Sequence, residues 1–224
     1  MKDKIRDLNR SSVWDYENGF YWFSSKTRLY KMLAHYELYK MITSLPGHIF
    51  ELGVYKGISL VRFCGFRDAL ENDYSRKIIG FDVFGEFPTN NLKVKDDLDF
   101  VERFEDVGGP GLSKEEVEDV LSSKGFENFQ LIKGNVFESL PKYLSENPET
   151  RIALLHLDMD VKEPTDFALE QLYERLVPGG IIVFDDYNMV AGETISVDEF
   201  IDKQKLKLEK LPFYKMPAYV RKPN

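Results

Sequence analysis

One stretch of the chain, residues 153–188, constrains the fold more than any other. It reads ALLHLDMDVKEPTDFALEQLYERLVPGGIIVFDDYN, in which an apolar strand, a helix, a glycine turn and a second apolar strand follow one another. Asp158 and Asp160 follow the first strand, and Asp185 and Asp186 follow the second. Because neighbouring parallel strands end at the same edge of a sheet, we expect these acids to converge. Crowded carboxylates need a counter-charge at neutral pH, so the pattern predicts a divalent cation site.

The rest of the chain continues this alternation. We expect helices over about 27–44, 57–72, 114–124, 137–146 and 196–205, strands over 48–53, 77–82 and 129–133, and two closing strands in LKLEKL and AYVRK. Strands that alternate with helices indicate an α/β fold with a parallel sheet and right-handed crossovers. The alternation stops between residues 83 and 113, which are polar. A loop of this length is a candidate lid or a disordered insertion.

Length and composition favour one globular unit. The 224 residues can bury one substantial core, and we expect a helical segment over 1–46 that leads into a main domain over 47–224. The net charge of −8 and the absence of a basic run argue against nucleic acid as a partner. No apolar run approaches the ~20 residues of a membrane span. The charged first twenty residues lack the apolar centre of a signal peptide, which predicts a cytoplasmic protein that does not engage membranes.

Two further features bear on partners and on cysteine chemistry. The amphipathic helix over 27–44 and the aromatic run Tyr21-Trp22-Phe23 could form a contact between two copies of the chain, as in a homodimer. A single cysteine, Cys64, excludes an internal disulfide and a cysteine-based metal site.

The first three strand ends carry residues that suit an adenosine. Gly53 and Gly57 bracket the turn after the first strand, where a helix N-terminus offers free N–H groups. Asp82 ends the second strand, where an acid can accept hydrogen bonds from ribose hydroxyls. Asn135 follows the third strand, where an amide can meet an adenine edge. The alternatives are that Asp82 caps a turn and that Asn135 caps the next helix.

Six motifs together resemble the macrocin O-methyltransferase family of sugar O-methyltransferases. They read GHIFELGVYKG (47–57), FDVFGEFP (81–88), GNVFESLP (134–141), ALLHLDMDVKEPT (153–165), VPGGIIVFDDYN (177–188) and GETISVDEF (192–200). The resemblance implies a Rossmann-like class I methyltransferase fold, with a seven-stranded, mostly parallel sheet and helices on both faces. It also implies two cofactors, S-adenosylmethionine and Mg²⁺, and a small-molecule acceptor, a hydroxyl of a nucleotide-linked or glycosidic sugar.

The resemblance also assigns roles to residues of this chain. It implies that the methionine and ribose parts of the cofactor lie against Glu51, Gly53, Tyr55, Gly57 and Ser59, with Asp82 on the ribose. It implies that Asp158, Asp185 and Asp186 hold the metal, and that Asp158 is also the catalytic general base. The chain departs from the family pattern at Asn135-Val136, Val161-Lys162 and Thr194, which puts adenine packing and substrate contacts in doubt there.

Elementary chemistry agrees with a metal at these acids. A hydroxyl is a poor nucleophile until it loses its proton, and a bound metal ion lowers its pKa. Carboxylate ligands favour a hard cation such as Mg²⁺. His156 is either a core residue or lies beneath the metal, and Asp160 either binds a substrate hydroxyl or caps the helix that begins near Pro164.

Two other functions remain open from the sequence. The string Asp158-Met159-Asp160 could bind a nucleotide sugar through Mn²⁺, as in a glycosyltransferase. The chain could also be a non-catalytic module that retains a cofactor-binding fold. The intact acids at 158, 185 and 186 argue against this second alternative.

Overall fold

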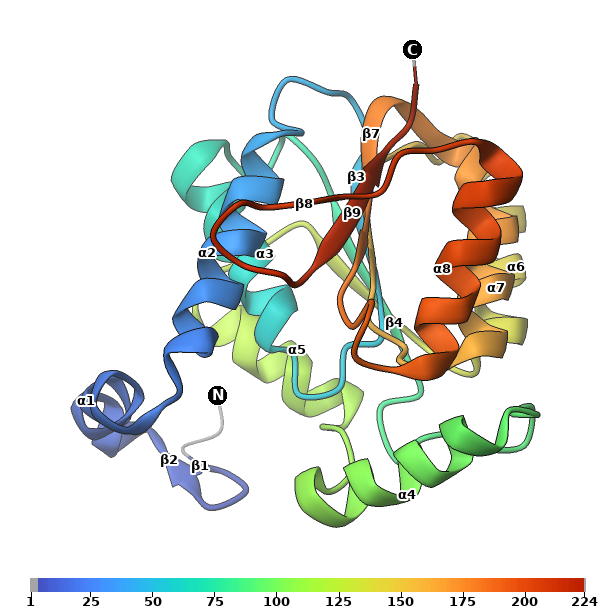
Figure 1. The fold of residues 1–224 in the computed structure, drawn as a ribbon. Coiled ribbons are helices and arrows are strands. Elements are labelled where there is room, and N and C mark those ends of the chain that lie inside the picture. The colour runs from blue at the N-terminus through green and yellow to red at the C-terminus, as the bar shows by residue number, and fades with distance from the viewer. Residues whose placement is uncertain (1–3, 224) are drawn as a thin grey trace.

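A seven-stranded sheet with helices on both faces forms the body of the molecule (Figure 1). The computed structural model describes residues 4–223. The strands are β3 (His48–Leu52), β4 (Ile78–Asp82), β5 (Phe129–Lys133), β6 (Ile152–Leu157), β7 (Leu176–Phe184), β8 (Glu209–Lys210) and β9 (Ala218–Arg221). Their order is β5-β4-β3-β6-β7-β9-β8; the first five are parallel, β9 runs antiparallel to β7, and β8 runs antiparallel to β9. The predicted fold is confirmed, including its two closing strands.

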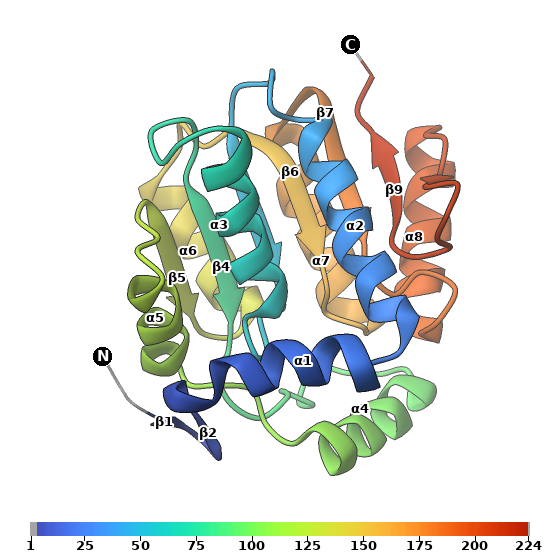
Figure 2. The ribbon, with the colours of Figure 1, turned by 90° about the vertical axis from the view of Figure 1, so that its left-hand side faces the viewer.

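Three helices pack on each face of the sheet (Figure 2). One face carries α2 (Lys26–Lys40), α3 (Ile58–Leu70) and α5 (Lys114–Ser123); the other carries α6 (Val136–Glu146), α7 (Lys162–Leu172) and α8 (Ala191–Gln204). Successive strand residues point to opposite faces, so Ile49 belongs to one core and Phe50 to the other. Burial of both faces explains why the central strands are continuous apolar runs.

The N-terminal elements lie beyond the carboxyl ends of the strands. They are β1 (Lys4–Ile5), β2 (Leu8–Asn9), the 3₁₀-helix η1 (Arg10–Ser12) and α1 (Val13–Phe23). A second 3₁₀-helix, η2 (Tyr173–Arg175), follows α7. Figure 2 shows α1 lying across the lower edge of the sheet beside α4. None of the α1 residues is buried, and Trp14, Trp22 and Phe23 are largely exposed.

The polar segment between residues 83 and 113 contains a helix, so the expectation of one long loop is wrong. Helix α4 (Lys95–Gly108) buries Asp97 and Val101 and places Phe100 and Phe104 on neighbouring turns. The apolar residues of α4 have helical spacing, but the seven acids between residues 83 and 113 favoured the prediction of a solvated loop.

Two helix boundaries also differ from the expected ones. The helix expected over 27–44 ends at Lys40, and the one expected over 196–205 begins earlier, at Ala191. Glycine at 192, which is unfavourable inside a helix, concealed that start. None of the helices in residues 4–223 combines the length and the apolar character that crossing a bilayer requires.

Candidate active site

The turn after β3 depends on glycine for two separate reasons. Gly53 has a φ of +91°, and a Cβ placed on it would lie 1.8 Å from the backbone oxygen of Asp158. Gly57 has a φ of +73° and precedes the first residue of α3. Both glycines are therefore required by their positive φ. Gly53 is required also because the end of β3 approaches the chain that leaves β6 too closely for a side chain. The turn is thereby held against the residue that begins the acid cluster.

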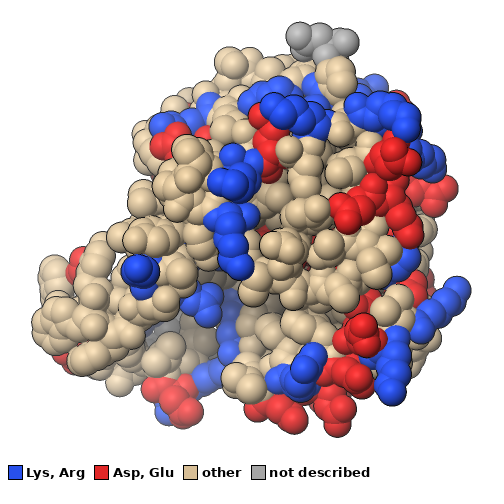
Figure 3. Space-filling view, in the orientation of Figure 1, with Lys and Arg blue, Asp and Glu red and all other residues tan. Residues whose placement is uncertain are grey.

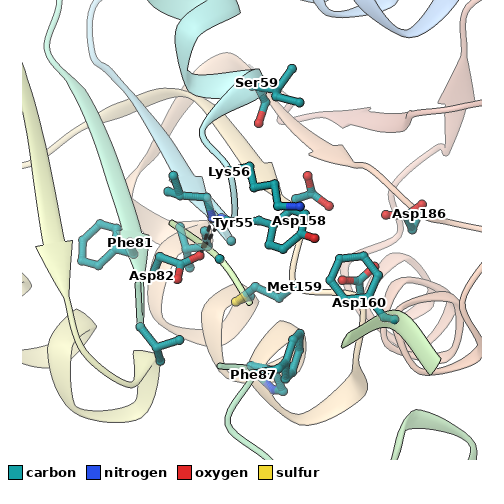
Figure 4. Close-up of a pocket in the computed structure, with 18 of the residues that line it drawn as sticks. Tyr55, Lys56, Ser59, Phe81, Asp82, Phe87, Asp158, Met159, Asp160 and Asp186 are labelled. Atoms are coloured by element: carbon teal, nitrogen blue, oxygen red, sulfur yellow. Dashed lines mark hydrogen bonds between the residues drawn. The ribbon is translucent and has the colours of Figure 1, made fainter. Parts of the chain in front are cut away.

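Asp82 fixes the glycine turn through hydrogen bonds to its backbone amides. Its Oδ2 accepts hydrogen bonds from the Val54 and Tyr55 amides at 2.7 and 2.9 Å, and its Oδ1 accepts one from the Phe84 amide at 2.6 Å. Figure 4 shows the carboxylate beneath the turn, at one end of the pocket. The turn-capping alternative is therefore correct, and the same carboxylate also lines the cavity.

Asn135 likewise has a structural contact and faces the cavity. Its Oδ1 accepts a hydrogen bond from the Phe137 amide at 3.2 Å, which makes it the N-cap of α6. The residue also lines the cavity. The N-cap alternative is thus correct, and it leaves the side-chain nitrogen as a donor for a ligand.

A cavity of about 860 Å³ lies at the carboxyl edge of the sheet. It brings together seven residues expected at the site: Gly53, Tyr55, Ser59, Asp82, Asn135, Asp158 and Asp186. The structure places three others behind its wall: Glu51, Gly57 and Asp185. Figure 4 shows Asp158, Asp160 and Asp186 grouped on the side of the pocket away from Asp82.

The predicted metal ligands lie together. One carboxylate oxygen from each of Asp158, Asp185 and Asp186 falls within a group of atoms no more than 4.8 Å apart. Burial and the charge of Asp185 hold the pKa of Asp158 well above its ordinary value, and the same two causes raise the pKa of Asp186. Burial and the charge of Asp186 also raise the pKa of Asp160 well above its usual range. The cluster has more acids than its local cations balance.

Asp185 is the exception among these acids because three cationic or imidazole groups surround it. Lys31 contacts its Oδ2, and the Nε2 atoms of His35 and His156 lie 3.3 and 3.4 Å from its Oδ1. Burial alone would raise the pKa of Asp185, but the two histidines and Lys31 hold it well below its ordinary value. Asp185 is therefore the ionised member of the cluster.

A buried chain of polar side chains connects the acid cluster with the glycine turn. Ser59 donates a hydrogen bond to Glu51 Oε1, which lies 3.3 Å from Nδ1 of His156. Burial lowers the pKa of His156, but hydrogen bonds to Asp185 and Glu51 outweigh that effect and raise it to about 9. An imidazolium at this position hydrogen-bonds Asp185 through Nε2 and forms an ion pair with Glu51 through Nδ1. His156 thus lies directly against the predicted metal ligand Asp185.

Three residues of this cluster were missed by sequence reasoning: Lys31, His35 and Glu193. Lys31 and His35 are four residues apart on the face of α2 that packs on the sheet, and that spacing was the available signal. Glu193 is fully buried, and its Oε1 accepts a hydrogen bond from the Asp186 amide at 3.0 Å. Burial and the charge of Asp186 raise the pKa of Glu193 well above its ordinary value.

Helix α4 covers the cavity and is attached at both ends. Near its N-terminus the buried Asp97 accepts a hydrogen bond from the Lys162 amide at 2.8 Å. At its C-terminus Lys56 Nζ donates to the Gly108 oxygen at 2.6 Å, and the Tyr55 hydroxyl donates to the Gly109 oxygen at 3.1 Å. Asp97 thus takes the capping position at α7 that was one alternative for Asp160. The structure instead puts Asp160, which has a φ of +63°, beside Asp186.

The residues present fit both implied cofactors. The donor set at Asp158, Asp185 and Asp186 consists only of carboxylate oxygens, which are the ligands that Mg²⁺ prefers. The cavity offers the turn amides, an acid and an amide side chain at successive strand ends, and it is of the size that small-molecule sites have.

Comparisons with known proteins agree with this geometry. The family model of the macrocin O-methyltransferases (TylF) matches residues 4–222. A tetracenomycin-C 4'-O-methyltransferase of Streptomyces olivaceus, whose name specifies a dimethoxy-rhamnosyl substrate, is 31% identical over 151 residues. That match covers 64% of this chain but only 54% of the relative, so the chain spans about half its length.

Solved structures show the same fold. The calicheamicin methyltransferase CalS11, also described as a TDP-rhamnose 3'-O-methyltransferase, superposes with a TM-score of 0.69 at 28% identity over 93% of this chain and 85% of its own. The O-methyltransferase NovP superposes with a TM-score of 0.74 at 22% identity over 87% of this chain and 80% of its own, a likeness of fold. With the family match over nearly its whole length, the chain has the class I methyltransferase fold and belongs to the macrocin O-methyltransferase family.

Proposed function

We propose that this protein transfers a methyl group from S-adenosylmethionine to a hydroxyl of a sugar, in a reaction that depends on Mg²⁺. The observation that carries the proposal is one cavity lined both by the glycine turn with Asp82 and by the acids Asp158 and Asp186. Methyl transfer needs a donor and an activated hydroxyl in the same enclosed space. Membership of the family and the sugar O-methyltransferases among the relatives support the same reaction. They do not favour the glycosyltransferase alternative.

The cofactor would lie along the first three strand ends. The backbone at Gly53 and Tyr55 and the hydroxyl of Ser59 would hold its methionine part, Asp82 would accept hydrogen bonds from the ribose, and Asn135 would donate to the adenine. Glu51 and Gly57 would act from behind the wall, because Glu51 fixes Ser59 and Gly57 permits the turn. These positions would direct the methyl group toward the acid cluster.

The acids would bind the metal and take up the acceptor proton. Asp158, Asp185 and Asp186 would be the metal ligands, and bound Mg²⁺ would lower the pKa of the acceptor hydroxyl and fix its direction. Asp158, which faces the cavity, would accept the proton directly or through a water molecule. Lys31, His35 and His156 would keep Asp185 ionised and oriented.

The test measures cofactor binding and methyl transfer separately. Calorimetry with S-adenosylhomocysteine should give a saturable heat, and labelled S-adenosylmethionine should pass its methyl to a sugar in a panel that contains TDP-rhamnose and methyl rhamnoside. Transfer should fall by about a hundredfold or more in EDTA and return with Mg²⁺. Binding without transfer to any sugar would favour a non-catalytic module. Turnover of UDP-sugars with Mn²⁺, without cofactor binding, would favour a glycosyltransferase.

A further inference from the structure

Two arginines at the cavity, Arg28 on α2 and Arg62 on α3, have no protein partner. Both line the cavity, and no residue in the range 4–223 forms a hydrogen bond or an ion pair with either guanidinium. Arg67, on the same helix as Arg62, differs sharply: its Nη1 donates to the backbone oxygens of Arg76 and Asn128 at 3.0 and 2.9 Å, and it pairs with Asp73. The fold therefore satisfies the buried guanidinium of Arg67 with protein acceptors, whereas the exposed Arg28 and the half-buried Arg62 keep their donors free at the cavity.

The two arginines also line the same cavity, where their charges act on each other. Burial lowers the pKa of Arg62, and the positive charge of Arg28 lowers it further, although the carboxylates of Asp185 and Glu51 oppose the shift. Like charges at one cavity, one of them half-buried, repel each other unless an anion joins them. In a chain with a net charge of −8, this arrangement is not a consequence of general basicity. Figure 3 shows the surface hollowed between α1 and the body of the molecule, with Lys and Arg side chains at the edge of the hollow.

The position of Arg28 indicates where the anion would lie relative to the acids. Arg28 precedes Lys31 by three residues on α2, and Lys31 contacts Asp185. Three residues of helix correspond to a rise of about 4.5 Å, so the Arg28 side chain leaves α2 about one turn before that of Lys31. A sugar with one hydroxyl at the acids would leave its substituent to extend toward Arg28 in the same cavity.

The number of donors indicates the kind of anion. One guanidinium is enough to bind a carboxylate through two parallel hydrogen bonds. Two guanidinium groups at one cavity match a group with more oxygens and more charge, such as a diphosphate. The acids at the far end of the cavity would repel a negatively charged acceptor. Cations near the entrance would offset that repulsion and let the acceptor bind.

We propose that Arg28 and Arg62 form an anion subsite that holds the diphosphate of a nucleotide-linked sugar, and that this is the acceptor class of the enzyme. The inference rests on the proposed methyl transfer to a sugar and decides between a nucleotide-linked and a glycosidic acceptor. Lys31 pairs with Asp185 and Lys56 donates to the Gly108 oxygen, so among residues 4–223 the two arginines are the cations that line the cavity without a protein partner.

Calorimetry without metal tests the subsite directly, because EDTA prevents the diphosphate from binding through a cation. The probes are inorganic pyrophosphate, UDP and TDP, with S-adenosylhomocysteine measured separately. Wild type should bind pyrophosphate and the nucleotides. Arg28→Gln and Arg62→Gln should each weaken that binding about tenfold to a hundredfold, as expected for the loss of a charged hydrogen-bonding group. The control Arg103→Gln removes the same charge from the exposed side of α4, outside the cavity, and should change neither affinity more than about twofold.

Each other outcome has a definite meaning. The subsite would be overturned if wild type failed to bind pyrophosphate. It would also be overturned if Arg103→Gln lost as much pyrophosphate affinity as Arg28→Gln and Arg62→Gln. Weaker S-adenosylhomocysteine binding with unchanged pyrophosphate binding would assign the arginines to the cofactor carboxylate and would also overturn it. Failure of wild type to bind S-adenosylhomocysteine would contradict the proposed function, while the pyrophosphate result would still decide the subsite. Thermal melts of the variants exclude loss of fold as the cause.

Discussion

At the scale of single residues, Gly53 carries the tightest constraint near the cavity. A Cβ there would lie 1.8 Å from the Asp158 oxygen, and the φ of +91° is unfavourable for any other residue. Gly53→Ala should therefore lower the free energy of unfolding by about 2–5 kcal/mol, the combined cost of backbone strain and overpacking. Urea denaturation of the variant measures this loss.

Gly125→Ala is the matched control because it separates the two causes. Gly125 has a similar φ of +81°, but no atom lies within 4 Å of the position of its Cβ. Its substitution should cost only the strain, about 1–2 kcal/mol. Equal losses for the two variants would mean that the approach of β3 to Asp158 is not a tight one.

Asp158 is the residue with the most direct proposed role in catalysis. Asp158→Asn keeps the shape of the side chain but removes its charge, so it can neither accept the acceptor proton nor bind a metal strongly. We expect kcat to fall by about a hundredfold to ten-thousandfold while the Kd of S-adenosylhomocysteine changes little. Single-turnover kinetics and calorimetry measure the two quantities.

The control for this variant is Asp202→Asn, which removes the same charge from an exposed position near the end of α8. It should leave both quantities unchanged. Retention of metal-dependent transfer by Asp158→Asn would transfer the role of base to another group, such as Asp160, which also faces the cavity.

The residues of the site could be predicted from the sequence to different degrees. Asp82, Asp158 and Asp186 were predictable because each follows a recognisable strand, and parallel strands bring their ends together. Lys31 and His35 were not, because they lie more than 100 residues away from Asp185 in the sequence and only the packing of α2 on the sheet brings them to it. Partners of this kind depend on tertiary structure rather than on local pattern.

At the scale of elements, the periodicity of apolar residues predicts the sheet and its six flanking helices, but it does not predict α4. Acids occupy most of its surface, so hydrophobicity alone suggested a loop, and its single fully buried carboxylate, Asp97, contradicts the usual pattern of burial. Burial raises the pKa of Asp97, and the amides of Lys162 and Gly192 only partly offset that effect. The position of α4 therefore depends on contacts with the starts of α7 and α8. These residues are too distant in the sequence for a local pattern to reveal the contacts.

Asp97→Ala tests whether this contact holds α4 over the cavity. The variant leaves the Lys162 amide without its acceptor, so we expect a loss of about 1–2 kcal/mol, the usual cost of a lost helix cap. Hydrogen exchange should become faster within residues 95–108 and not in the sheet. The KM for the acceptor should rise more than kcat falls, because the covering helix would be displaced.

Asp99→Ala is the matched control, since Asp99 is an exposed acid on the same helix. It should leave exchange and KM unchanged. Uniformly faster exchange throughout the protein in Asp97→Ala would mean that Asp97 supports global stability and does not act as a local anchor.

At the scale of the whole molecule, the distribution of charge is uneven in a way that the net charge of −8 conceals. Acids gather at the ends of β6 and β7, and the cations that lie against them are Lys31, which comes from the helix layer of α2, and His156, which lies within β6. Lys31 is the cation in closest contact with the predicted metal ligands. The charges of Asp185, Asp158 and Asp186 together outweigh burial and raise the pKa of Lys31 above its ordinary value.

An ammonium in this position competes with a metal for the same carboxylates, which leads to a prediction about the stability of the whole protein. Lys31→Gln should destabilise the metal-free protein by about 3 kcal/mol, because it leaves the buried Asp185 with His156 as its one charged partner among the described residues. Mg²⁺ should then bind more tightly than in wild type, since no ammonium has to be displaced. The difference should appear as a larger rise in Tm on addition of Mg²⁺, because a ligand that binds only the folded state stabilises it by mass action. Lys26→Gln, at the exposed start of the same helix, is the control and should respond as wild type does. Equal metal-free stability and equal Mg²⁺ response in all three proteins would show that Lys31 and the metal do not share a site.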